Sequence, residues 1–123
     1  MAMKKILVVD DDPVILKLLE QHLTYAGYEV LIGKNGCEAV AAAKEKHPNL
    51  ILLDVSMPDM DGGEVAQELR GNPATKNIPI IFLTGILSKE EERAAGNVIA
   101  GNIFIAKPYE REKLLALVRQ KIN

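Results

Sequence analysis

Long runs of apolar residues alternate with amphipathic stretches along this chain. Four runs show no polar alternation, which is typical of strands buried on both faces of a parallel sheet. They lie within Lys5–Val9, Leu50–Leu53, Pro79–Leu83 and Ile103–Ala106. A further run, Tyr28–Ile32, alternates weakly and predicts a strand nearer the edge of the sheet. The pattern therefore predicts five strands.

Apolar residues at helical spacing predict five helices that alternate with these strands. Asp12 is placed to cap the first helix and Pro13 to begin it. The fourth begins at the capping-box spacing of Ser88–Glu91 and loosens toward Val98. The expected ranges are 13–26, 37–46, 64–70, from 88 onward, and 110–122. In the first helix we expect these residues to face the core: Ile15, Leu18, Leu19, Leu23 and Ala26.

Strands joined by helical crossovers run parallel, and each crossover is right-handed. The 123 residues suffice for one such domain and leave no room for a second. We therefore expect one α/β domain over residues 1–123. It should be a doubly wound, three-layer sandwich of five parallel strands and five helices.

Polar side chains stand where four of the strands end. Asp10 and Asp11 follow the first strand, Asp54 ends the third, and Thr84 ends the fourth; Lys107 follows the last strand. Because the carboxyl ends of parallel strands meet at one edge of a sheet, these side chains should gather there. Beyond Asp54, the residues Pro58, Gly62 and Gly63 predict irregular backbone.

Three neighbouring carboxylates repel one another unless a cation lies among them. Carboxylate oxygens suit Mg²⁺ or Mn²⁺ better than zinc. Lys107 would add an ammonium and Thr84 a hydroxyl, which together suit a phosphoryl group carried by Asp54. The chemistry predicted is formation and hydrolysis of an aspartyl phosphate, with no catalysis on a separate substrate.

Four motifs resemble one protein family over the whole chain. They are Val8-Val9-Asp10-Asp11, Leu52-Leu53-Asp54 with Met57-Pro58-Asp59-Met60-Asp61-Gly62, Leu83-Thr84-Gly85, and Phe104-Ile105-Ala106-Lys107-Pro108. In this order and at this spacing, they resemble the receiver domain of two-component response regulators, of the single-domain chemotaxis and sporulation type. The resemblance implies a flavodoxin-like sheet with strand order 2-1-3-4-5.

The resemblance also implies a role for each site residue. Asp54 would be the phosphoacceptor, and Asp10 and Asp11 the acidic pair. Mg²⁺ would be bound by Asp11, Asp54 and the backbone carbonyl of Ser56. Thr84 and Phe104 would be the switch residues, which reshape the face formed by the fourth helix, last strand and last helix. Lys107-Pro108 would be a cis peptide.

The partners implied by the resemblance are proteins of a phosphorelay. A histidine kinase or a histidine phosphotransfer protein would dock on the first helix, at Val14, Ile15 and Leu18. A downstream protein would receive the signal by contact, unless the chain is a piece of a longer protein. The segment Ala100–Phe104 is one residue shorter and more apolar than the family pattern, and Ser56 and Ile86 lie where the family tunes the phosphoryl lifetime.

Composition limits which binding partners and which cellular compartment are expected for this protein. The net charge is −2 and there is no stripe of Arg and Lys, so direct binding of nucleic acid is not expected. No apolar run approaches the roughly 18 residues of a membrane span, and the N-terminus lacks a signal-peptide pattern. The single cysteine, Cys37, is expected to be a buried, inert thiol in a reducing cytoplasm. His22 and His47 are expected to have no chemical role.

Two other functions fit parts of the sequence. Asp10–Val14 matches the nucleophile motif of haloacid-dehalogenase-like phosphatases, but those enzymes need an acidic motif after the lysine, and no Asp follows Asp61. A phosphorylation-independent interaction module of the same fold is the second alternative. A flavodoxin-like cofactor binder is disfavoured, because no glycine-rich phosphate loop follows the first strand.

Overall fold

Five parallel strands form the sheet at the centre of the molecule. The structure is a computed structural model that describes residues 3–55, 62–84, 98–99, 102–106 and 109–122. The parallel strands are β1 (Lys5–Val9), β2 (Glu29–Gly33), β3 (Leu50–Asp54), β4 (Ile80–Thr84) and β6 (Asn102–Ala106). They lie side by side in the order β2-β1-β3-β4-β6. The predicted flavodoxin-like order, 2-1-3-4-5 when these strands are counted along the chain, is confirmed.

A short sixth strand, β5 (Val98–Ile99), pairs antiparallel with the start of β6 at the edge of the sheet. The prediction that Val98 ends a helix is therefore wrong. Two consecutive β-branched residues favour extended backbone, and here they find ladder partners in Asn102 and Ile103. The helix predicted to begin at Ser88 lies outside the described residues.

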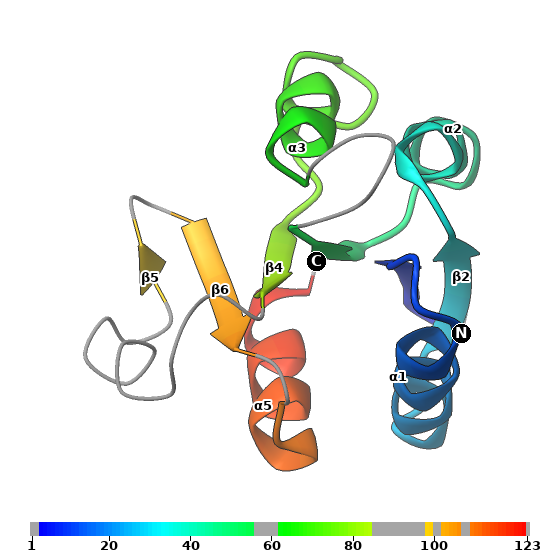
Figure 1. Ribbon diagram of the computed structural model, residues 1–123. Coiled ribbons are helices and arrows are strands. Elements are labelled where there is room, and N and C mark those ends of the chain that lie inside the picture. The colour runs from blue at the N-terminus through cyan, green and yellow to red at the C-terminus, as the bar shows by residue number, and fades with distance from the viewer. Residues whose placement is uncertain (1–2, 56–61, 85–97, 100–101, 107–108, 123) are drawn as a thin grey trace.

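Four helices within the described ranges cover the two faces of the sheet (Figure 1). On one face lie α1 (Pro13–Tyr25) and α5 (Arg111–Lys121), and on the other lie α2 (Gly36–Lys46) and α3 (Gly62–Arg70). This is the expected three-layer arrangement. None of these helices combines the length and the apolar character that crossing a membrane requires.

Each face of the sheet has its own apolar core, because alternate residues of a strand point to opposite faces. Toward α1 and α5, the core includes Ile6 and Val8 of β1 and Leu50 and Leu52 of β3. Toward α2 and α3, it includes the intervening residues: Leu7, Val9, Ile51 and Leu53. This explains why these strands read as unbroken apolar runs.

The start of α1 has the predicted cap. The side chain of Asp12 accepts a hydrogen bond from the Val14 amide at 2.9 Å, and Pro13 is the first helical residue. The far end of α1 contacts the segment that leads into α5, where the Tyr109 hydroxyl lies 3.2 Å from His22 Nδ1. Burial raises the pKa of Tyr109 to about 12. Which of the two groups donates the hydrogen bond depends on the tautomer of His22.

Two predictions of burial are wrong. The buried stripe of α1 is Leu16, Leu19 and Leu23, whereas Leu18 is 39% exposed and Ala26 is exposed. Leu19 and Leu23 belong to both the predicted and the observed buried stripe. The observed stripe contains Leu16 in place of Leu18. Cys37 is exposed rather than buried, because α2 turns Ala39, Val40 and Ala43 toward the core.

The predicted irregular backbone at Gly62 and Gly63 is also wrong, because both residues begin α3. Gly62 starts this helix directly against the end of β3. Its amide donates to the Val55 carbonyl at 2.7 Å. A Cβ at this position would lie 2.6 Å from the Asp54 carbonyl oxygen and 2.8 Å from the Val55 Cα. Glycine is needed here for close approach of two backbones.

We expect Gly62→Ala to lower the free energy of unfolding by about 1 to 3 kcal/mol, the usual effect of forcing a methyl group into packed backbone. Urea unfolding measures the loss. Gly71→Ala is the matched control, since the nearest atom to its Cβ would be the Gln67 carbonyl oxygen at 3.4 Å. Equal losses in the two variants would contradict the argument from close approach.

Candidate functional site

Three neighbouring strands bring polar side chains to one edge of the sheet. Asp10 directly follows β1, Asp54 ends β3, and Thr84 ends β4. The registers pair Val9 with Leu53, and Asp54 with Leu83, so the strands end level with one another. All three polar residues are buried, with exposed fractions of 0% for Asp10, 6% for Asp54 and 5% for Thr84.

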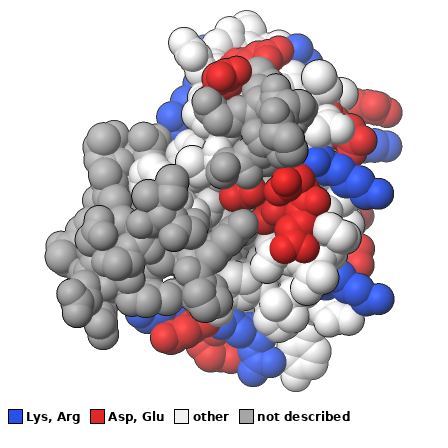
Figure 2. Space-filling view, in the orientation of Figure 1, with Lys and Arg blue, Asp and Glu red and all other residues white. Residues whose placement is uncertain are grey.

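Three of the predicted site residues form a carboxylate cluster. Asp10, Asp11 and Asp54 each place one carboxylate oxygen within 4.8 Å of the others. Asp11 is exposed, so the cluster is open to solvent on one side. Figure 2 shows acidic side chains gathered near the middle of the face that Figure 1 presents. The gathering expected from the parallel topology is therefore present for these three residues.

Backbone hydrogen bonds hold the carboxylate of Asp10 and the backbone on either side of the two buried acids. Asp10 Oδ1 accepts from the Asp12 amide at 3.0 Å, and the Asp10 amide donates to the Gly33 carbonyl at 3.2 Å. Beyond Asp54, the Val55 amide donates to the Leu83 carbonyl at 3.0 Å, which continues the β3–β4 ladder past the acid. Asp12 instead turns its side chain to the start of α1 and stands outside the cluster.

The donor set of the cluster fits a hard divalent cation. All three side chains offer carboxylate oxygens, and two of them are almost fully removed from water. Buried carboxylates at this spacing are stabilised by positive charge. Oxygen donors with one side open to water are the surroundings in which Mg²⁺ and Mn²⁺ bind, since these ions keep several waters.

Several predicted features lie outside the described residues. These are Ser56, Lys107, the peptide bond between Lys107 and Pro108, and Ile86. The roles predicted for them stay predictions.

The predicted switch residue Phe104 lies half-buried on the face of the sheet that carries α3. Its ring stacks on that of Phe82, with centroids 5.1 Å apart and planes at 23°. The guanidinium carbon of Arg70 lies 5.9 Å from the centroid of the Phe82 ring. Sequence reasoning missed Phe82 and Arg70. The signal for Phe82 was available, because the two phenylalanines occupy the same position relative to the ends of their strands.

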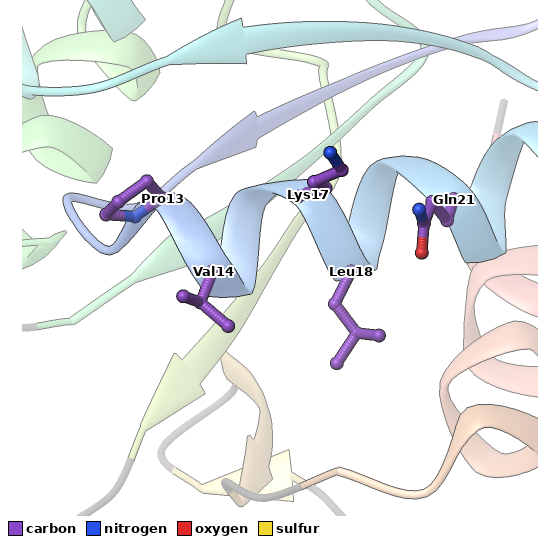
Figure 3. A pocket seen from close by; sticks show the side chains of 5 residues that line it. All are labelled: Pro13, Val14, Lys17, Leu18 and Gln21. Carbon is purple, nitrogen blue, oxygen red and sulfur yellow. The ribbon is translucent and has the colours of Figure 1, made fainter.

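A groove of about 450 Å³ runs along α1 from Pro13, two residues after Asp11, to Gln21. Val14 and Leu18 point from the same side of the helix into this region (Figure 3). Val14 is 71% exposed and Leu18 is 39% exposed. Ile15, predicted with them as a docking residue, instead packs partly buried against the core. The groove is lined by Pro13, Val14, Lys17, Leu18 and Gln21.

Comparison with known proteins places the chain in a family. Residues 6–119 match the family model described as the response regulator receiver domain. A probable transcriptional regulator, ycf27, from Porphyridium aerugineum is 40% identical over 123 residues, which are 100% of this chain and 50% of that protein. The DNA-binding dual master transcriptional regulator RpaA of Synechocystis is 37% identical over 95% of this chain and 48% of its own length. The chain thus spans about half the length of these curated relatives.

Solved structures of other proteins are similar to this chain in sequence and in fold. Vibrio cholerae chemotaxis protein CheY4 is 34% identical, with a TM-score of 0.84 over 98% of this chain and 100% of that one. The receiver domain of the sensor histidine kinase PA1611 from Pseudomonas aeruginosa is 30% identical, with a TM-score of 0.82 over 98% of each chain. That structure has a magnesium ion coordinated in its active site cleft. The chain belongs to the response regulator receiver domains of two-component systems.

Proposed function

We propose that this domain accepts a phosphoryl group on Asp54 from a phosphorylated histidine of a kinase or phosphotransfer protein. The observation that carries the proposal is the carboxylate cluster, in which Asp10, Asp11 and Asp54 meet within 4.8 Å at the strand ends. The same edge holds the buried hydroxyl-bearing residue Thr84. A purely structural edge of a sheet would not require two buried acids beside a third.

In the proposed reaction, a carboxylate oxygen of Asp54 forms a bond to phosphorus while the bond from phosphorus to the donor histidine nitrogen breaks. The bonding electrons stay with the leaving imidazole. A carboxylate needs no general base for this attack. Hydrolysis by water later returns Asp54 and releases phosphate. The domain would thus be modified and restored without acting on a separate substrate.

Asp10, Asp11 and Asp54 would hold Mg²⁺ or Mn²⁺, with the backbone carbonyl of Ser56 as a further proposed ligand. When bound, the cation supplies positive charge opposite the phosphoryl oxygens. The magnesium in the receiver structure from Pseudomonas aeruginosa supports this assignment. Thr84 would donate its hydroxyl to a phosphoryl oxygen, and Lys107 would place its ammonium beside another.

The donor would dock on the groove of α1. Val14 and Leu18 offer exposed apolar surface there, Lys17 offers a positive charge, and Pro13 begins the helix beside the cluster. A donor protein seated on this groove would lie next to the rim that carries Asp54. The two functions, docking and transfer, would then use adjacent surfaces.

The output would follow from a change of conformation at Thr84 and Phe104. A state favoured by the phosphoryl group would present a different face of β6 and α5 to a downstream protein. The curated relatives are transcriptional regulators about twice as long as this chain. In a longer protein of that kind, contact with DNA would be made by other segments. The phosphorylation-independent module remains the alternative, and the intact carboxylate cluster disfavours it.

Acetyl phosphate and Mg²⁺ should add one acid-stable, base-labile phosphoryl group to the wild-type protein, as counted by mass spectrometry. Asp54→Asn should remain unlabelled, because the amide is not a nucleophile for this transfer. Asp12→Asn is the matched control, since asparagine also caps helices well and Asp12 stands outside the cluster. Equal labelling of wild type and Asp54→Asn would remove Asp54 from the role.

Asp11→Ala should weaken the binding of Mg²⁺ or Mn²⁺ roughly tenfold or more, because a charge near a cation contributes on the order of 1 to 4 kcal/mol. Isothermal titration calorimetry measures this loss. With a chelator present, the variant should be at least as stable as wild type, since one of three repelling charges is gone. Lys107→Ala should keep metal affinity while losing labelling. An unchanged titration in Asp11→Ala would contradict the ligand assignment.

Leu18→Ala should slow phosphoryl transfer from a phosphorylated histidine phosphotransfer protein about five- to thirtyfold, the effect of removing a central apolar contact. Labelling by acetyl phosphate, which needs no docking, should stay at the wild-type rate. Tyr25→Ala is the control, because Tyr25 is 88% exposed on the same helix outside the groove. A loss of the same size with both donors would assign Leu18 to the fold rather than to docking.

A further inference from the structure

The two phenylalanines of this chain form one stacked pair. The sequence contains only Phe82 and Phe104, and they are direct partners in the register of β4 and β6. Their ring centroids are 5.1 Å apart, and the ring planes differ by 23°. Phe82 is 5% exposed, whereas Phe104 is half-buried. An offset stack of this kind is a favourable arrangement of two aromatic rings.

Phe82 is the anchored member of the pair. It belongs to the buried core between the sheet and the helices α2 and α3. Arg70, in the exposed last turn of α3, places its guanidinium over the Phe82 ring at 5.9 Å from the centroid. A cation at this distance is attracted by the face of the ring. Core packing and Arg70 therefore hold the Phe82 ring in the plane on which Phe104 stacks.

The pair lies on the same face of the sheet as Thr84. Phe82 and Thr84 are two residues apart on β4, and side chains at this spacing point to the same face. Thr84 in turn pairs with Ala106, two residues beyond Phe104 on β6. A rearrangement of Thr84 toward a phosphoryl group would thus occur next to the stack.

We propose that the Phe82 ring is the seat of Phe104, meaning the surface on which the Phe104 ring stacks in the unphosphorylated domain, and that Arg70 stabilises this seat. The proposal rests on the phosphoacceptor function proposed above and adds its regulation. The stack stabilises the unphosphorylated arrangement, and Phe104 leaves it when the domain switches. Phe82 and Arg70 are then positioning residues, which set how much of the unphosphorylated domain already has the switched conformation.

This role makes a thermodynamic prediction. For a ligand that binds only the switched state, the apparent Kd is the intrinsic Kd divided by the fraction of molecules in that state. Loss of the stacked contact should raise this fraction about two- to tenfold, the equilibrium equivalent of one aromatic pair. Loss of the cation over the ring should raise it about two- to fivefold. The apparent affinity for a phosphoryl mimic should tighten by the same factors.

The chain suits a fluorine experiment, because biosynthetic 4-fluorophenylalanine gives only two signals. The probe is beryllofluoride with Mg²⁺, a stable mimic of a phosphoryl group on an aspartate. Phe82→Leu keeps apolar bulk and leaves a single signal, that of Phe104. We expect the Phe104 signal of the wild type to move on binding, and the mimic to bind more tightly to Phe82→Leu and to Arg70→Gln.

Two controls separate this role from general loosening of the structure. Val40→Ala removes bulk from the same core on α2, which packs against β1 and β2, and Arg119→Gln removes the arginine in the last turn of α5. Both should bind the mimic with wild-type affinity. Thermal unfolding checks that each variant folds. If Phe82→Leu does not fold, the exposed substitution Arg70→Gln decides the question alone.

The outcomes are distinguishable. If wild type binds no mimic, the phosphoacceptor site is overturned, and the role of the stack falls with it. If wild type binds and Phe104 moves, but Phe82→Leu and Arg70→Gln keep wild-type affinity, only the seat is overturned. A Phe104 signal that stays in place during binding also overturns the seat. If Arg70→Gln alone keeps wild-type affinity, Arg70 is removed from the proposal.

Discussion

Mutual repulsion among Asp10, Asp11 and Asp54 is the constraint on which the rest of the structure depends. Two of these acids are almost fully buried, and all three have oxygens within 4.8 Å. Charges at such distances interact by a few kcal/mol per pair even with partial screening, on the order of the net stability of a domain. The opposing force comes from β1 and β3, whose side chains are buried on both faces. The apolar sandwich thus fixes the positions of the strand ends that carry the three acids.

This balance couples the site to the fold. Positive charge that enters the cluster relieves the repulsion, so it stabilises the folded state as well as the site. Gly62 extends the coupling, because α3 begins against the carbonyl of Asp54. The backbone around Asp54 is consequently held from two sides, by the ladder to β4 and by the first turn of α3. A displacement of Asp54 would therefore displace β4 and the first turn of α3 as well.

The strands and their ends could be predicted from the sequence because burial on both faces leaves a distinctive pattern. Leu50–Asp54 shows this best: four aliphatic residues end at an acid, and the acid lies where the strand ends. Helix faces were harder to predict. The leucines of α1 fit two stripes, and only tertiary packing selects Leu16 over Leu18. The burial predicted for Cys37 is wrong because packing turns Ala39, Val40 and Ala43 of α2 toward the core instead.

Other features depend on contacts that local sequence does not encode. The stack of Phe82 on Phe104 follows from the pairing of β4 with β6, which can be inferred only after the sheet order is known. The start of α3 at Gly62 depends on the approach of one backbone to another, where turn propensity indicated a loop. The edge strand β5 needs β6 beside it. Each case is a tertiary interaction that overrides a local preference.

The position of β1 has a consequence for how the chain can be altered. Although β1 comes first in the chain, it lies inside the sheet and bonds to β2 on one side and β3 on the other. Deleting it would divide the sheet in two rather than trim its edge. Circular permutation or fusion should therefore preserve the first strand, whereas β5, at the edge of the sheet, contributes a ladder of two residues.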